Sequence, residues 1–136
     1  MSEQLELDLF EQWRPVVGYE GLYEVSDVGR VRSLARTVLH PHSGRYTLCG
    51  RILSPHPDGC GYLKVRLHRD GQGRTRKVHQ LVLEAFVGPR PAGLECCHAD
   101  DDKTNNRLSN LRYDTRSANM LDQVRNGRHR WARQAA

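Results

Sequence analysis

Residues 94 to 126 hold the side chains best suited to chemistry, in an expected order of strand, long loop, strand and helix. The first strand, from Leu94 to His98, ends on an imidazole. A backbone carbonyl can hold one of its nitrogens while the other takes a proton from water. Asn119, on the helix, offers a neutral amide oxygen, which suits a hard cation such as Mg²⁺. Between the strands, ADDDKTNNRLSN is rich in Asp and Asn, and so long a loop in a small protein is typically functional.

Each of these side chains also has a structural explanation. Taken alone, His98 fits a buried packing residue and Asn119 fits an exposed helix amide, so only a shared pattern favours catalysis. The second strand is expected from Leu111 to Asp114, and the helix from Ser117 to Asn126, with Ser117 as its cap and Gly127 as its stop. In the loop, Asn105 and Asn106 are interpreted as loop formers. Asp100, Asp101 and Asp102 are interpreted as turn residues, with contact to a metal as the alternative.

A shared pattern exists, because three stretches resemble parts of one family. ECCHADDDKTNNRLSNLRYDTRSANM resembles the core of HNH endonucleases (the ββα-metal or His-Me finger), especially the phage and intron-associated branch. HQLVLEAFVG resembles the helix that precedes that core, and WRPVVGYEGLYEVSDVGRVRSL is similar to the nuclease-associated modular domain often found before it. These stretches cover roughly half of the chain, in the order that the family shows.

The resemblance implies a function and a role for individual residues. The function would be hydrolysis of phosphodiester bonds in DNA with a single divalent cation, Mg²⁺ or alternatively Mn²⁺. His98 would be the general base, Asn110 the structural middle residue of the catalytic motif, and Asn119 the metal ligand. Target sequence, nicking against double-strand cutting, and oligomeric state stay open.

One position departs from the family. Many HNH enzymes carry Asp, Asn or His just before the general base as another metal ligand, whereas this chain has Cys97, and a thiolate binds Mg²⁺ poorly. The metal could then be held by Asn119, phosphate and water, or one of the loop aspartates could substitute. A third possibility is weak activity, so the alternative function is a DNA-binding or regulatory module that keeps the HNH fold.

Cysteine spacing argues against a further alternative, a zinc-stabilised interaction domain. The chain has no C-x-x-C pair, so we expect free thiols and no zinc. The four cysteines are Cys49, Cys60, Cys96 and Cys97.

The charge pattern points to a polyanion. The net charge of +5 is uneven: residues 30 to 77 hold eleven Lys or Arg against two Asp, and residues 103 to 136 hold eight against two. Either block alone could be an ordinary solvated surface. Two blocks made mostly of Arg, whose planar guanidinium can bind two phosphate oxygens at once, favour DNA as the partner. The expected contacts are Lys64, Arg66, Arg107, Arg112 and Arg116.

The elements that must position these residues follow from periodicity and turn signals. Short strands are expected between residues 13 and 34, loops from 35 to 60 with a strand near Arg51 to Leu53, and a basic hairpin from residues 61 to 77 turning at Asp70-Gly71. An apolar stripe predicts a helix over residues 78 to 87. His79, beside that stripe, is interpreted as a packed, hydrogen-bonded residue, with a catalytic or ligand role as the alternative.

Together these features predict an α+β protein with a short antiparallel β module before a small ββα-metal core. The expected division is an acidic tail (1–12), a DNA-binding β module (13–77), the nuclease core (78–127) and a basic tail (128–136). No apolar run reaches the ~20 residues that cross a bilayer, and the acidic start lacks a signal-peptide pattern. We therefore expect no membrane partner, no small-molecule cofactor, and a cytoplasmic location, that of the host cell if the chain is phage-encoded.

Overall fold

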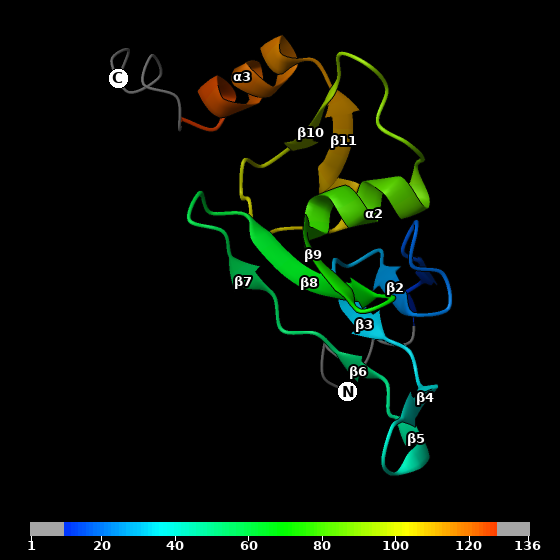
Figure 1. Ribbon diagram of the computed structural model, residues 1–136. Helices are drawn as coiled ribbons and strands as arrows, with labels where there is room; N and C mark the ends of the chain where they lie inside the picture. Colours follow the sequence, from blue (N-terminus) through cyan, green and yellow to red (C-terminus); the bar gives the residue numbers. More distant parts are fainter. Residues whose placement is uncertain (1–9, 128–136) are drawn as a thin grey trace.

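A computed structural model describes residues 10–127 (Figure 1). The strands are β1 (Trp13–Pro15), β2 (Tyr23–Ser26), β3 (Val31–Ser33), β4 (Arg36–His40), β5 (Gly44–Leu48), β6 (Arg51–Ile52), β7 (His56–Pro57), β8 (Leu63–Arg69), β9 (Gln72–Lys77), β10 (Glu95–His98) and β11 (Leu111–Asp114). The helices are α2 (Val78–Phe86) and α3 (Arg116–Arg125), with a short 3₁₀ helix, η1 (Leu108–Asn110). The predicted α+β class is confirmed.

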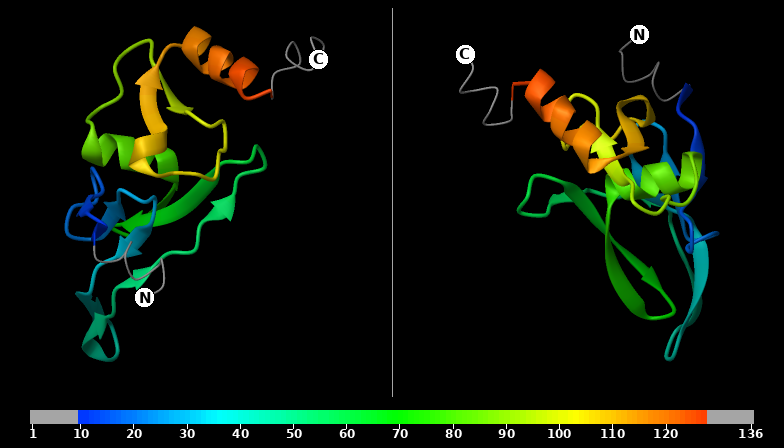
Figure 2. Two further views of the ribbon diagram at one scale, coloured as in Figure 1. Left: turned by 180° about the vertical axis from the view of Figure 1, so that it is seen from behind. Right: turned by 90° about the horizontal axis from the view of Figure 1, so that it is seen from above.

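The strands form four small antiparallel sheets. Their orders are β1-β2-β3-β6, β7-β8-β9, β4-β5 and β10-β11. The β4–β5 hairpin projects at the end of the molecule opposite to α3, and the view from behind shows the same separation (Figures 1 and 2). Within residues 10–127, no helix is long and apolar enough to span a bilayer.

Helix α2 lies at the centre of the fold. It packs against β1, β2, β8 and β9 on one side and against β10 and β11 on the other. In the predicted stripe, Val78, Leu81 and Val82 are at most 1% exposed, and its last members, Ala85 and Phe86, are half-buried. Leu83, outside that stripe, is also fully buried, because strands cover α2 from two directions. The helix therefore carries the shared core of both halves of the chain.

The predicted basic hairpin forms, and the side chains of β8 alternate between buried and exposed. Val65 and Leu67 of β8 are buried, whereas Arg66 and His68 are exposed. Asp70 and Gly71 both have positive φ, 53° and 78°, which is the backbone of a two-residue hairpin turn. One face of the hairpin thus builds the core, and the other carries exposed side chains such as Arg66 and His68.

Three expectations need correction. Residues 36–48, predicted as loop, form the β4–β5 hairpin; β5 is exposed on both faces, so burial leaves no periodic signal. β7 was likewise not predicted. Helix α3 begins at Arg116 rather than Ser117, because the side chain of Thr115 caps it by accepting from the Ala118 amide (3.1 Å). The predicted tails lie largely or wholly outside the described residues.

A turn of the β module docks onto the long loop between β10 and β11. The Leu108 amide donates to the Asp27 carbonyl oxygen (2.8 Å). Gly29 has a φ of +90°, and a Cβ there would lie 2.8 Å from the Cβ and carbonyl oxygen of Asn106. This glycine is required both by its conformation and by the close approach of the loop.

A pair of glycine substitutions separates these two requirements. Gly18 has a similar φ of +87° but no atom within 4 Å of a built Cβ. Gly18→Ala should therefore show the backbone cost alone, while Gly29→Ala adds overpacking of roughly 1–3 kcal/mol. Urea denaturation should show a larger loss of unfolding free energy for Gly29→Ala. Equal losses would mean that the turn does not press on the loop.

Candidate active site

The pairing of β10 with β11 sorts the site residues onto two faces. Directly opposed residues in an antiparallel pair share a face, and neighbours along a strand alternate. One face, toward α3, has the pairs Glu95–Asp114 and Cys97–Arg112; the other, toward α2, has Cys96–Tyr113 and His98–Leu111. Cys97 and His98, adjacent in sequence, therefore have different surroundings.

Asn110 closes the Asp- and Asn-rich loop. Its Nδ2 donates to Asp100 Oδ1 (2.9 Å) and to the Asn105 carbonyl oxygen (2.9 Å), and its Oδ1 accepts from the Asp100 amide (3.1 Å). Asn105 donates to the other Asp100 oxygen (2.8 Å). Burial raises the pKa of Asp100, but hydrogen bonds from Asn105, the Asp102 amide and Asn110 outweigh it, so this pKa lies below its ordinary value. Asn110 thus holds the loop together, and the Asp100 carboxylate is occupied by hydrogen bonds from other residues of that loop.

His98 is held by a side chain that the sequence did not single out. Its Nε2 lies 2.9 Å from Oδ1 of Asn106, and both residues are only 4% exposed. An amide oxygen can only accept, so in the neutral ring this contact places the proton on Nε2 and leaves Nδ1 as the acceptor nitrogen. The expected partner was a backbone carbonyl, and Asn106 was interpreted as a loop former. Nothing in the spacing distinguishes Asn106 from Asn105, because only the folded loop turns one of them inward.

Two aromatic rings pack behind His98. The ring centre of His79 lies 4.9 Å from that of His98, and Tyr62 lies 5.0 Å from His79. Burial, then the neighbouring His98 and Lys77, lowers the pKa of His79 to about 3, so its ring stays neutral. His79 is packed as expected, but its buried Nδ1 has no hydrogen-bond partner in the described part of the chain.

On the other face, a buried carboxylate fixes α3 across the strands. Asp122, 3% exposed, accepts from Arg112 of β11 (2.5 Å) and from Arg125 (2.7 Å). Arg112 also donates to Asp114 (2.9 Å), and Arg125 donates to the Ala99 carbonyl oxygen (3.2 Å), one residue after His98. Arg112 is therefore engaged within the protein, unlike the exposed Arg107 and Arg116.

The same face holds Asn119, Glu95 and Cys97. Nδ2 of Asn119 lies 3.4 Å from Oε2 of Glu95. Cys97 is 1% exposed, and burial raises the pKa of its thiol to about 11, so at neutral pH it is an uncharged, poor ligand for a hard cation. Carboxylate and amide oxygens suit such a cation, and Glu95 and Asn119 offer them here. No hydrogen bond joins His98 to Asn119 within residues 10–127.

The side chains that commonly bind zinc do not cluster in the described part of the chain. Among residues 10–127, no three His, Cys, Asp or Glu side chains converge as a zinc site would require. All four cysteines are free thiols.

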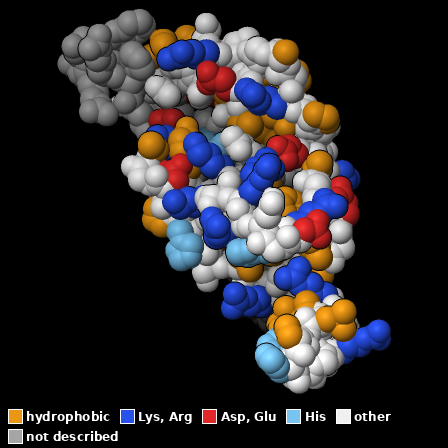
Figure 3. All heavy atoms as spheres, viewed as in Figure 1, with side chains coloured by type: hydrophobic (Ala, Val, Ile, Leu, Met, Phe, Trp, Pro, Cys, Tyr) orange, Lys and Arg blue, Asp and Glu red, His pale blue; other side chains and the backbone are white. Residues whose placement is uncertain are grey.

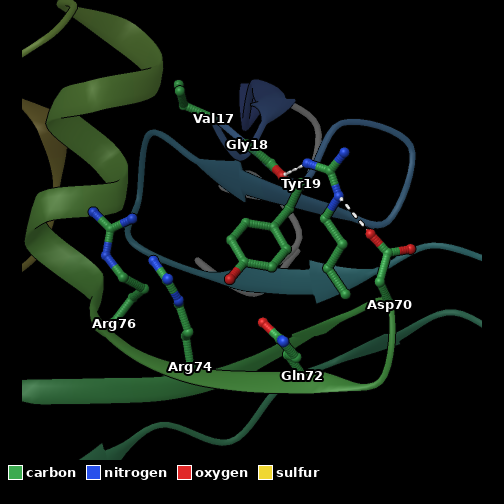
Figure 4. Close-up of a pocket in the computed structure, with 8 residues that line it drawn as sticks. Val17, Gly18, Tyr19, Asp70, Gln72, Arg74 and Arg76 are labelled. Atoms are coloured by element: carbon green, nitrogen blue, oxygen red, sulfur yellow. Dashed lines mark hydrogen bonds and ion pairs between the residues drawn. The ribbon is translucent and has the colours of Figure 1, made fainter.

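Basic side chains line two hollows of the β module. A groove of about 800 Å³ is lined by residues that include Arg36, Arg51, Arg66 and His68. A second hollow, of about 460 Å³, has Arg74 and Arg76 of β9 beside Tyr19 (Figure 4). On the face shown in Figure 3, basic and His side chains are visible at the β4–β5 end, and acidic side chains are not. This agrees with the sequence, which has no Asp or Glu from residue 30 to 57.

Comparison with known proteins accounts for both halves of the chain. Residues 11–68 match the NUMOD4 motif, and residues 76–121 match the HNH endonuclease family. The chain carries an HNH endonuclease domain preceded by a NUMOD4 motif. Over 116 residues it is 33% identical to the DNA endonuclease I-HmuI of Bacillus phage SP01, covering 85% of this chain and 59% of that relative.

A solved structure gives the same match. It concerns DNA binding and cleavage by the HNH homing endonuclease I-HmuI, and the TM-score is 0.68 at 33% identity. The match covers 92% of this chain and 66% of that one, so the chain spans only part of its relative. The HNH domain contains α2, β10, β11 and most of α3, and thus His98, Asn110 and Asn119. The NUMOD4 motif contains Lys64 and Arg66.

The low pKa of His79 makes stability depend on pH. Above its ordinary pKa of 6.5 the ring is neutral in both states; between 6.5 and about 3 only the unfolded chain binds the proton, so stability falls as pH falls. From pH 7 to 5 this one group should remove about 2 kcal/mol of unfolding free energy. His79→Phe should flatten the profile, measured by urea denaturation, whereas His42→Phe, at an exposed position, should not. A profile unchanged by His79→Phe would contradict the assignment.

Proposed function

We propose that this protein is a DNA endonuclease that hydrolyses phosphodiester bonds with His98 as general base and a single divalent cation. The observation that carries the proposal is the orientation of His98 in an HNH domain. Asn106 accepts from Nε2, so Nδ1 keeps the lone pair that a base needs. I-HmuI, a relative of both halves of the chain, is a DNA endonuclease.

In the proposed reaction, Nδ1 of His98 takes a proton from water as the water oxygen bonds to phosphorus. The bond from phosphorus to the 3′ oxygen breaks, which leaves 5′-phosphate and 3′-hydroxyl ends once the leaving oxygen takes a proton from solvent. His98 becomes an imidazolium, and the Asn106 oxygen stabilises the charge through its hydrogen bond. Asn110 holds the loop that carries Asn106.

Asn119 is proposed as a protein ligand of the cation, through its amide oxygen. When bound, Mg²⁺ or Mn²⁺ offsets charge that develops on the phosphate and the leaving oxygen. The oxygen donors at Asn119 and Glu95 fit such an ion better than zinc, which favours nitrogen and sulfur.

The basic side chains would hold the DNA backbone. Lys64 and Arg66 lie on the outward face of β8, and Arg107 and Arg116 are exposed near the HNH site. Phosphate contacts of this kind position DNA without selecting a sequence. Arg112 would act indirectly, since it orients α3 through Asp122.

Cys97 favours a second candidate function, a DNA-binding module with the HNH fold that does not cut. Its buried thiol lies at the position where the resemblance to HNH enzymes implies a metal ligand. Incubating plasmid DNA with the protein and Mg²⁺ or Mn²⁺ decides between them: nicked or linear product supports the endonuclease, and intact plasmid with retained binding supports the module.

His98→Ala should lower the single-turnover cleavage rate by about 10² to 10⁴-fold, the usual contribution of a positioned base. DNA affinity, measured by fluorescence anisotropy in EDTA, should change little. His42→Ala, an exposed histidine in the β4–β5 turn, serves as the matched control. Cutting by His98→Ala at the wild-type rate would remove His98 from the mechanism.

Lys64→Gln and Arg66→Gln should weaken binding to all DNA sequences alike. Each lost phosphate contact should lower the slope of log affinity against log salt concentration by about one unit. Anisotropy titrations at several salt concentrations, on two unrelated duplexes, measure both effects. A change in preference at one base pair alone would show that these residues read bases instead.

A further inference from the structure

We propose that the Glu95 carboxylate is a ligand of the divalent cation together with Asn119, and that it takes the role left open by Cys97. The inference rests on the proposed function. Glu95 lies three positions before His98, and the resemblance to HNH enzymes assigns it no role.

The strand geometry brings Glu95 to the required face. Residues 95 and 97 of β10 point to the same side, about 7 Å apart along the strand. The packing of α3 on β10 confirms this placement, because Nδ2 of Asn119 lies 3.4 Å from Oε2 of Glu95. Glu95 is half-buried, and Cys97, two residues further along the same face, is 1% exposed. A cation and its waters can therefore reach Glu95.

The other carboxylates nearby are already engaged. Arg112 holds Asp114 and Asp122, and Arg125 also holds Asp122. Asp100 accepts hydrogen bonds from Asn105 and Asn110 inside the loop. By contrast, no Lys or Arg of residues 10–127 lies within ion-pair distance of Glu95, whose contact on this face is a neutral amide. Glu95 is thus a partly accessible carboxylate without a protein cation.

The donor chemistry fits a hard cation. Asn119 presents its amide nitrogen to Glu95, and a half-turn of the amide group brings Oδ1 to the same gap. One carboxylate and one amide oxygen would then face each other, and water and a phosphate oxygen can complete the shell, as Mg²⁺ commonly keeps several waters.

Binding of Mn²⁺ to the free protein tests this directly, through loss of the free-ion electron paramagnetic resonance signal. Glu95→Gln should weaken Mn²⁺ binding by at least about tenfold, because even the loss of a group that only supports a metal ligand typically costs about 10- to 100-fold. The matched control is Glu84→Gln, since Glu84 is also a half-buried glutamate but is paired with Arg76. Its affinity should stay within about twofold of wild type, with circular dichroism confirming that both variants fold. Wild-type Mn²⁺ affinity in Glu95→Gln would overturn the proposal.

A rescue variant tests the substitution for Cys97. If Glu95 replaces a carboxylate at position 97, adding Cys97→Asp to Glu95→Gln should restore Mn²⁺ affinity. A folded double variant that stays weak would overturn that part, and the Glu95→Gln result stands by itself if the double variant does not fold.

Plasmid cleavage by the wild-type chain, assayed in parallel, keeps the two proposals distinct. Cutting by wild type together with unchanged Mn²⁺ affinity in Glu95→Gln would refute the role of Glu95 alone. Weakened Mn²⁺ binding in Glu95→Gln, without any cutting by wild type, would support the metal site and refute the endonuclease.

Discussion

The side chains of the HNH site can act together only as the pairing of β10 with β11 allows. Alternation along β10 sends His98 toward α2 and sends Glu95 and Cys97 toward α3. A shift of the register by one residue would exchange these faces and separate His98 from Asn106. The hydrogen bonds of Asn110 to Asp100 hold the two strands together at the loop end of the hairpin, and Arg125 of α3 donates to the Ala99 carbonyl oxygen at the same end. The proposed base and the proposed cation ligands therefore lie on the two sides of one strand.

The same site is tied to the NUMOD4 motif. Helix α2 packs on strands of both halves, and the turn at Gly29 presses on Asn106, the residue that orients His98. Few atoms thus separate the module with the basic hairpin from the proposed base. A carbon added at Gly29 would force Asn106 to move, and Asn106 is the residue that holds His98. The position of the β module therefore affects the orientation of His98.

The elements with periodic burial and the residues of the family motif were predictable from the sequence. The β8–β9 hairpin and α2 were predictable because one face of each is buried, which imposes a period of two or of about 3.6 residues. The β4–β5 hairpin was missed because β5 buries neither face. The family resemblance gave the positions of His98, Asn110 and Asn119 on their elements. Asn106 and Glu95 were missed because their contacts come from loop packing and from the seating of α3 on β10, which local spacing does not reveal.

Charge balance explains how a thiol can occupy position 97. On the face toward α3, Asp114 and Asp122 are offset by Arg112 and Arg125. A carboxylate at a position only 1% exposed would add a third negative charge, which is costly unless a cation is bound. Cys97 fills the space as a small apolar residue, so α3 can seat on β10 with its charges balanced by protein groups alone. The proposed anionic ligand, Glu95, lies instead at the start of the strand, where water still reaches the carboxylate when no cation is bound.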